Sequence, residues 1–132
     1  MTRFAIFTLC VIVLSAEPLL AAARDCAAAM SQTEMSICAG DEHKAADVEL
    51  TKVYHDLMMK ASESGKISLR DAERAWIFYR DKECSFATTG TSGGSVHPMV
   101  LSQCLTQKTN ARIAELKAQL NCEEGDLSCG GQ

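Results

Sequence analysis

Apolar residues recur at helical spacing in the first half of the chain. Between residues 42 and 62 they fall three or four positions apart, at Ala46, Leu50, Val53, Leu57 and Ala61. Such steps place side chains on one face of an α-helix. We therefore expect a helix over residues 42–62. The sequence Ser64-Gly65-Lys66 is expected to end it, because Gly is common just past a helix C-terminus.

A shorter helical turn is expected before this helix. Ser31 and Glu34 have the spacing of a capping box, in which each side chain satisfies a free backbone N–H of the first turn. The turn would lead to Cys38. Gly40 and Asp41 are expected to interrupt it and to separate it from the long helix.

Ser68 is the predicted N-cap of a second long helix, with Asp71 three residues further on. The apolar side of this helix includes Trp76 and Tyr79, and the helix is expected to end near Cys84. The link between the two helices, residues 65–67, is short. A short link favours antiparallel neighbours, so the two helices should form a hairpin.

A third helix is predicted after a loop over residues 85–97, which is rich in Gly, Ser and Thr. Pro98 suits the first turn of this helix. The helical period continues through Leu101, Leu105, Thr109, Arg112, Ile113, Leu116 and Leu120. Residues 121–132 lack an amphipathic period and should form an irregular tail. The expected fold is all-α: a small three-helix bundle, with an antiparallel hairpin plus a third helix.

The N-terminus has the three parts of a secretory signal peptide. Arg3 is the basic residue, residues 4–16 are apolar, and Ala21-Ala22-Ala23 offers a peptidase cleavage site. An uncleaved membrane anchor is the alternative, but the apolar run is short and Glu17 is costly in hydrocarbon. We expect cleavage near Ala23, a periplasmic or secreted protein without stable membrane insertion, a helical domain over residues 24–120 and a tail over residues 121–132.

Composition narrows the possible partners. Loss of residues 1–23 leaves 12 basic and 16 acidic residues, a net charge of −4. This balance disfavours nucleic acid and favours a cationic partner. No CxxC pair occurs and the three histidines are scattered, so neither a metal nor another cofactor is expected. No nucleophile–base pair or HExxH motif is present, so an enzyme is not expected.

The residues also match a known pattern. It consists of Cys26, Glu34, Cys38, Asp47-x-Glu49-Leu50, Tyr54, Ala75-Trp76-x-x-Tyr79-Arg80-Asp81-x-x-Cys84, Gly93-Gly94-Ser95, Cys104 and Arg112-x-x-x-Leu116. This order, from Cys26 to Leu116, resembles the LprI-like lysozyme-inhibitor family of small exported bacterial proteins. The resemblance implies a helical fold and inhibition of lysozyme. The chain departs from the family at Thr51, often Asn, and at Glu73, often Gln, and both positions are expected to be exposed or marginal.

Six cysteines remain after the signal peptide, and an even number in a small exported chain indicates disulfides. The family spacing favours Cys26–Cys38 and Cys84–Cys104, which leaves Cys122–Cys129. Cys38–Cys84 is an alternative that antiparallel packing would permit. The bundle is therefore expected to be disulfide-linked.

The motif residues have expected structural roles. Trp76 on the apolar face of a helix should be part of the core. Tyr79 should pack beside it with its hydroxyl at the edge. Arg80 should pair with a carboxylate of the first helix, either Asp47 or Glu49.

The loop over residues 85–97 is the candidate binding element, because long loops on rigid scaffolds often carry function. Its candidate contact residues are Ser92, Gly93, Gly94, Ser95 and His97. The hydroxyls and the imidazole could donate hydrogen bonds to the two carboxylates of a lysozyme cleft. The hypothesis is an exported inhibitor that blocks the cleft of basic c-type lysozyme. The alternative is a non-catalytic envelope module that binds another envelope protein.

Overall fold

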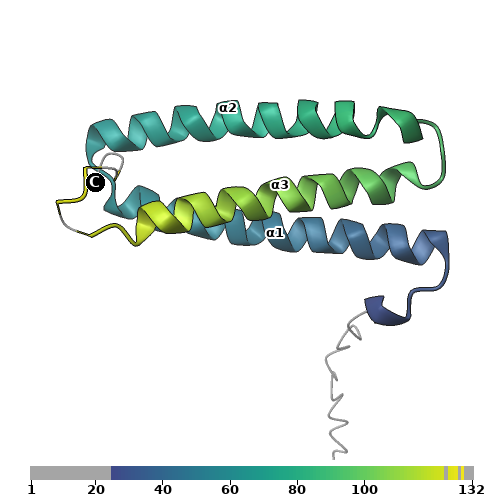
Figure 1. Cartoon of the computed structure of the whole chain (residues 1–132). Coiled ribbons are helices and arrows are strands. Elements are labelled where there is room, and N and C mark those ends of the chain that lie inside the picture. The colour runs from purple at the N-terminus through teal and green to yellow at the C-terminus, as the bar shows by residue number, and fades with distance from the viewer. Residues whose placement is uncertain (1–24, 124, 128, 130–132) are drawn as a thin grey trace, which may run out of the picture.

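A computed structural model describes residues 25–123, 125–127 and 129. Three long helices dominate it: α1 (Gln32–Lys60), α2 (Glu63–Ala87) and α3 (His97–Leu120). Two short 3-10 helices, η1 (Cys26–Ala28) and η2 (Thr89–Thr91), precede α1 and follow α2. Helices α1 and α3 lie side by side and run in the same direction, and α2 runs antiparallel to both (Figure 1). The predicted all-α three-helix bundle with an irregular tail is confirmed.

Helix α1 is longer than the sequence predicts. The capping box at Ser31 is present, since its hydroxyl accepts from the Glu34 N–H and the Glu34 carboxylate accepts from the Ser31 N–H. The expected interruption at Gly40 and Asp41 is wrong, because the helix continues through both. A glycine inside a helix costs only about 1 kcal/mol relative to alanine. The neighbouring Cys38 and Ala39 are buried on this helix, which favours its continuation.

The junction between α1 and α2 also differs from the prediction. Helix α1 ends at Lys60, and the Ser62 side chain caps α2 by accepting from the Gly65 N–H at 3.2 Å. Gly65 and Ser68 therefore lie inside α2, and the expected stop at Ser64-Gly65-Lys66 and the expected cap at Ser68 are wrong. The hydroxyl of Ser62 provides a cap six residues earlier, and only two residues link the helices. The antiparallel hairpin is confirmed.

The apolar core lies mainly between α1 and α3. Its buried members are Leu50, Val53, Leu57, Ile113 and Leu116, and Tyr54, Leu69, Trp76 and Leu120 pack against them. Burial of each such aliphatic side chain contributes about 1.5–3 kcal/mol. Helix α2 adds only partly buried apolar residues to this cluster. Its buried residues are Gly65, Glu73, Arg80 and Cys84, so polar groups hold much of this helix in place.

Three disulfides link the fold: the two pairs that the resemblance implies, and the pair that these leave over. Cys26–Cys38 joins η1 to α1, Cys84–Cys104 joins α2 to α3, and Cys122–Cys129 closes the tail. The alternative pair Cys38–Cys84 is wrong.

The expected signal peptide, residues 1–23, lies outside the described residues. Among the helices that the structure does describe, none combines the length and the apolar character needed to cross a membrane.

Candidate functional site

The candidate loop is shorter than predicted, because α2 continues to Ala87 and α3 begins at His97. The connection therefore spans residues 88–96 instead of 85–97. Thr88 ends α2: its N–H and its hydroxyl both donate to the Cys84 carbonyl, at 3.1 and 2.8 Å. Thr88 is 3% exposed, so the loop starts from a fixed and buried residue.

Successive turns hold the backbone of the loop. The Ser92 N–H donates to the Thr89 carbonyl, the Gly94 N–H to the Thr91 carbonyl, and the His97 N–H to the Gly94 carbonyl, all at 3.0–3.1 Å. Each of these hydrogen bonds joins an N–H to the carbonyl three residues before it and so closes one turn. The loop is thus a compact run of turns and not an open strand of chain.

Two glycines are required at the tip of the loop. Gly93 has φ +77°, a left-handed conformation that side chains disfavour. A Cβ on Gly94 would lie 3.1 Å from the Thr91 carbonyl oxygen, a tight contact with backbone. These two glycines and the flanking Ser92 and Ser95 are exposed. The tip therefore presents two hydroxyls and a stretch of bare backbone to solvent.

His97 connects the loop to the first turn of α3. Its Nδ1 lies 2.9 Å from the Thr91 hydroxyl oxygen, and that hydroxyl donates to the Thr88 carbonyl at 2.8 Å. Because the hydroxyl has one proton, Nδ1 must be the donor to it. The opposite nitrogen, Nε2, is then an acceptor in the neutral ring. The imidazole is half-buried and helps to hold the loop.

A disulfide links the two sides of the loop. Cys84 is fully buried in the last turns of α2, and its Cα lies 5.7 Å from that of Cys104 on α3. The loop projects from the end of the bundle at which α1 begins (Figure 1). The structure thus places Ser92, Gly93, Gly94 and Ser95 together in one protruding tip, with His97 at its base.

The motif residues form a cluster at the centre of the bundle. The Arg80 guanidinium donates to Asp47 at 2.8 Å, to Asp81 at 2.9 Å and to Thr109 at 3.1 Å. Trp76 contacts this guanidinium at 5.3 Å from the ring centroid. Arg80 thereby joins α2 to both other helices, and of its two predicted partners, Asp47 and Glu49, it pairs with Asp47.

A second arginine completes the cluster from α3. Arg112 lies 5.8 Å from the Trp76 ring centroid and donates to Glu73 at 3.0 Å and to Glu115 at 2.9 Å. Glu73 is 8% exposed, so the expectation of a marginal, exposed position is wrong. Its carboxylate is buried because it pairs with the guanidinium of Arg112, a contact between helices that sequence spacing alone cannot reveal.

Two further expectations for these residues need revision. Tyr79 is 51% exposed, so it does not pack in the core beside Trp76, and its ring instead contacts the Lys108 ammonium at 5.6 Å. Glu49 pairs with Lys117 on α3 at 2.7 Å and not with Arg80. That hydrogen bond and the lysine charge lower the pKa of Glu49 below its usual value.

The side chains that lie close enough to hold a metal ion include two cysteines that are bonded to each other. In the described part of the chain, Cys122, Asp126 and Cys129 lie close enough to share an ion. Both cysteines are in a disulfide, however, so neither can supply the thiolate that a zinc site needs.

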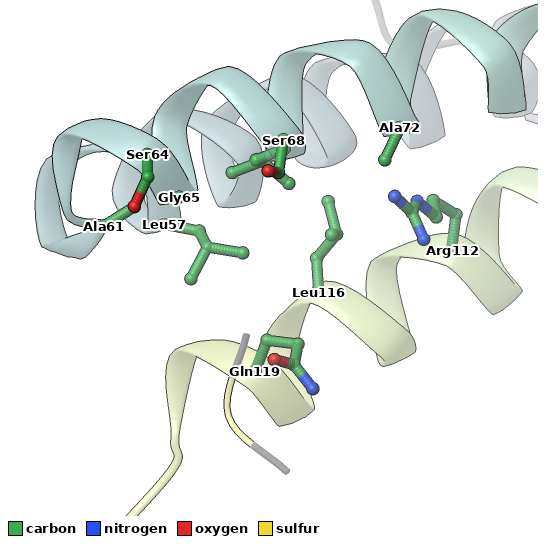
Figure 2. A pocket seen from close by; sticks show the side chains of 10 residues that line it. Leu57, Ala61, Ser64, Gly65, Ser68, Ala72, Arg112, Leu116 and Gln119 are labelled. Carbon is green, nitrogen blue, oxygen red and sulfur yellow. The ribbon is translucent and has the colours of Figure 1, made fainter. Parts of the chain in front are cut away.

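Two grooves flank α2, and neither was anticipated from the sequence. One, of about 420 Å³, lies where α2 begins and α3 ends; Leu57 and Leu116 line it, with Arg112 at one side and Gln119 at the other (Figure 2). The second, of about 450 Å³, lies between α1 and α2 and includes Glu73. Small residues of α2, Ser64, Gly65, Ser68 and Ala72, line the first groove.

These features define a small, disulfide-linked helical domain with one protruding loop. A family model described as "Lysozyme inhibitor LprI" matches residues 23–116. The chain is 41% identical over 113 residues to an uncharacterised protein of Rhizobium meliloti (strain 1021), a match that covers 76% of this chain and 81% of the relative. The chain belongs to the LprI lysozyme-inhibitor family. No solved structure matches it. The family and the three disulfides are typical of an extracytoplasmic protein.

Proposed function

We propose that this protein is an exported inhibitor of lysozyme-type muramidases and that the loop over residues 88–96 blocks the substrate cleft. The observation that carries the proposal is the protruding tip of Ser92, Gly93, Gly94 and Ser95, held at its base by Cys84–Cys104. A preorganised loop loses little conformational entropy when it enters a cleft, which favours tight binding.

The tip offers the right chemistry for a cleft with carboxylates. Its residues carry no charge, so nothing in them repels a carboxylate. Within the described part of the chain, the N–H groups of Gly93 and Ser95 make no hydrogen bond. These two donors, with the hydroxyls of Ser92 and Ser95, can satisfy carboxylate oxygens directly. The two glycines add no side chain that would obstruct a narrow cleft.

Overall charge supports the encounter. The chain has a net charge of −4, and c-type lysozymes are basic, so long-range attraction should raise the association rate. This attraction should weaken as salt is added, because ions screen exposed charges beyond about 10 Å at 0.1 M.

The test is an assay of cell-wall lysis by c-type lysozyme with the purified mature protein. We expect inhibition at micromolar concentration and low salt. Ser95→Asp places a carboxylate on the exposed tip and should weaken inhibition at least tenfold. Ser64→Asp makes the same charge change at the start of α2, at the opposite end of the bundle, and is the matched control.

Three results would decide against this function or its site. Absence of any inhibition by the folded protein would reject lysozyme as the target. Equal inhibition by the Ser95→Asp and Ser64→Asp variants would reject the loop as the contact surface. A replacement of residues 92–95 by a linker of equal length gives a second check, because inhibition should be lost while the helical circular dichroism is retained.

One observation favours a second candidate function, a non-catalytic interaction module of the envelope. Phe78 and Phe86 on α2 are 66% and 79% exposed, and aromatic residues of this kind are enriched at protein interfaces. Crosslinking in envelope extracts should then recover one stoichiometric partner other than a lysozyme, and Phe78→Ser should abolish its recovery.

A further inference from the structure

Two arginines differ from the other basic residues in the described part of the chain. Each of the others contacts a carboxylate, a backbone carbonyl or an aromatic ring. Arg70 and Arg74 make no such contact among the described residues. They lie four residues apart on α2, so both point from one face of the helix. This face of α2 therefore carries two arginines that have no partner among the described residues.

Both arginines line the groove of about 450 Å³ between α1 and α2. The opposite wall comes from α1 and includes Thr51, Tyr54 and His55. The Tyr54 and His55 rings contact each other edge to face, with centroids 5.5 Å apart. The volume falls within the range of small-molecule sites, about 300–1,000 Å³, and aromatic walls are common in such sites.

Glu73 supplies a buried acceptor in the same groove. It is 8% exposed, and the Arg112 guanidinium holds its Oε2 at 3.0 Å. Its Oε1 is buried and has no hydrogen-bond partner among the described residues. A buried acceptor without a partner is unfavourable, so a ligand whose donor reaches Oε1 would gain free energy from that hydrogen bond.

We propose that this groove binds a small acidic sugar, a molecule that combines a carboxylate with hydroxyl or amide donors. The carboxylate pairs with Arg70 and Arg74, and a hydroxyl or amide N–H donates to Glu73 Oε1. The ring of Tyr54 provides a flat apolar surface for the sugar. Arginine suits this role because its planar guanidinium matches a carboxylate with two parallel hydrogen bonds.

The groove is separate from the proposed inhibitory loop. Glu73 and Thr88 are 15 residues apart on α2, which corresponds to about 22 Å along the helix axis. The positive charge of Arg70 and Arg74 would also repel a basic lysozyme. The sugar site is thus independent of lysozyme inhibition, and its test uses no lysozyme.

N-Acetylmuramic acid and N-acetylglucosamine form a matched pair of probes, since the first carries a carboxylate on an ether side chain that the second lacks. Titration of the mature protein, followed by the amide shifts in its NMR spectra, measures both affinities. We expect N-acetylmuramic acid to bind at least tenfold more tightly and to shift amides of residues 50–55 and 70–77. Acetate, which has the carboxylate alone, should also bind at least tenfold more weakly.

Substitutions test which side chains of the groove contact the sugar. The double substitution Arg70→Gln and Arg74→Gln should reduce the affinity for N-acetylmuramic acid at least tenfold. Lys82→Gln removes a positive charge from the same helix outside the groove and should leave the affinity unchanged. Glu73→Leu should also weaken binding, with the folded state checked by circular dichroism because it removes the pair with Arg112.

The proposal fails if N-acetylmuramic acid does not bind, or if N-acetylglucosamine binds equally well. It also fails if the double arginine variant binds as tightly as the Lys82→Gln control. If acetate bound as tightly as N-acetylmuramic acid, the hydroxyl and amide donors of the sugar would contribute nothing, and Glu73 would have no role. The groove would then only attract anions in general. These outcomes remain decisive if the Glu73 variant does not fold, because the two arginines are exposed and form no ion pair or hydrogen bond with a described residue, so their replacement should leave the fold intact.

Discussion

Arg80 Nη1 lies 2.8 Å from Asp47 Oδ1, across the interface between α2 and α1. The same nitrogen lies 3.1 Å from the hydroxyl of Thr109, which is completely buried on α3. One guanidinium therefore connects all three helices. This matters because α2 contributes few buried apolar side chains and depends on such contacts to stay against the α1–α3 pair.

Arg80→Ala should destabilise the fold by about 2–4 kcal/mol, because it removes a buried side chain that packs on Trp76 and leaves the buried Thr109 hydroxyl without its partner. The lost pair with Asp47 adds less, since that carboxylate is partly exposed. Urea unfolding monitored by circular dichroism measures this change. Asp81→Ala removes a partner of the same arginine that is itself exposed, and should cost less than about 1 kcal/mol. Similar losses for the two variants would contradict the role of Arg80 as the central link.

The sequence predicts the helices of this protein better than their junctions. Apolar periodicity reports which face of a helix is buried, and it located the α1 core residues Leu50, Val53 and Leu57. Glycine is ambiguous, because it can end a helix or lie within one. Gly40 and Gly65 both lie within helices here, since burial of neighbours and the Ser62 cap outweigh their low helical propensity.

The site is less predictable, because its key features are contacts between helices. The sequence identified the glycines of the loop, but its extent depends on where Thr88 ends α2. Opposite charges on adjacent helices predict Asp47 or Glu49 as the partner of Arg80, and only the structure selects Asp47. Burial of Glu73 could not be predicted in this way, since a glutamate is almost never fully buried unless it is paired. The groove beside Glu73 arises only when α1 and α2 are placed together.

Gly93→Ala should destabilise the protein by about 1–2 kcal/mol, because a left-handed conformation is unfavourable for alanine. Thermal unfolding measures the change. Gly90→Ala is the control: Gly90 lies in η2, its φ is not in the positive range, and a Cβ there meets no atom within 4 Å. That variant should be nearly neutral. A neutral Gly93→Ala would show that the tip adopts another conformation in solution.

Stability should decrease in acid partly through Glu49. The hydrogen bond from Lys117 and its charge lower the pKa of Glu49 in the folded state below the ordinary value of 4.5. The pair therefore stabilises the fold above about pH 4.5 and is lost as the pH falls through the lowered pKa. We expect Glu49→Gln to reduce the slope of stability against pH below 4.5. Glu42→Gln, at an exposed position of the same helix, should not change it.

The disulfide at the base of the loop should contribute both to the stability of the fold and to the proposed inhibition. The Cys84–Cys104 bond spans 20 residues, and its loss through Cys84→Ala and Cys104→Ala should cost about 3 kcal/mol, because the unfolded chain gains freedom. It should also weaken the inhibition that we propose, since the base of the loop is released from α3. Urea unfolding and the lysis assay measure the two effects under conditions in which the variant remains folded.

The matched control is the tail disulfide, Cys122–Cys129, which spans 7 residues and joins no helix to another. Alanine at both positions should change stability by less than about 1 kcal/mol, because none of the tail residues that the structure describes is part of the core. Inhibition should be unaffected. If loss of Cys122–Cys129 weakened inhibition as much as loss of Cys84–Cys104, the contact surface would have to include the tail, which lies at the other end of the bundle from the loop (Figure 1).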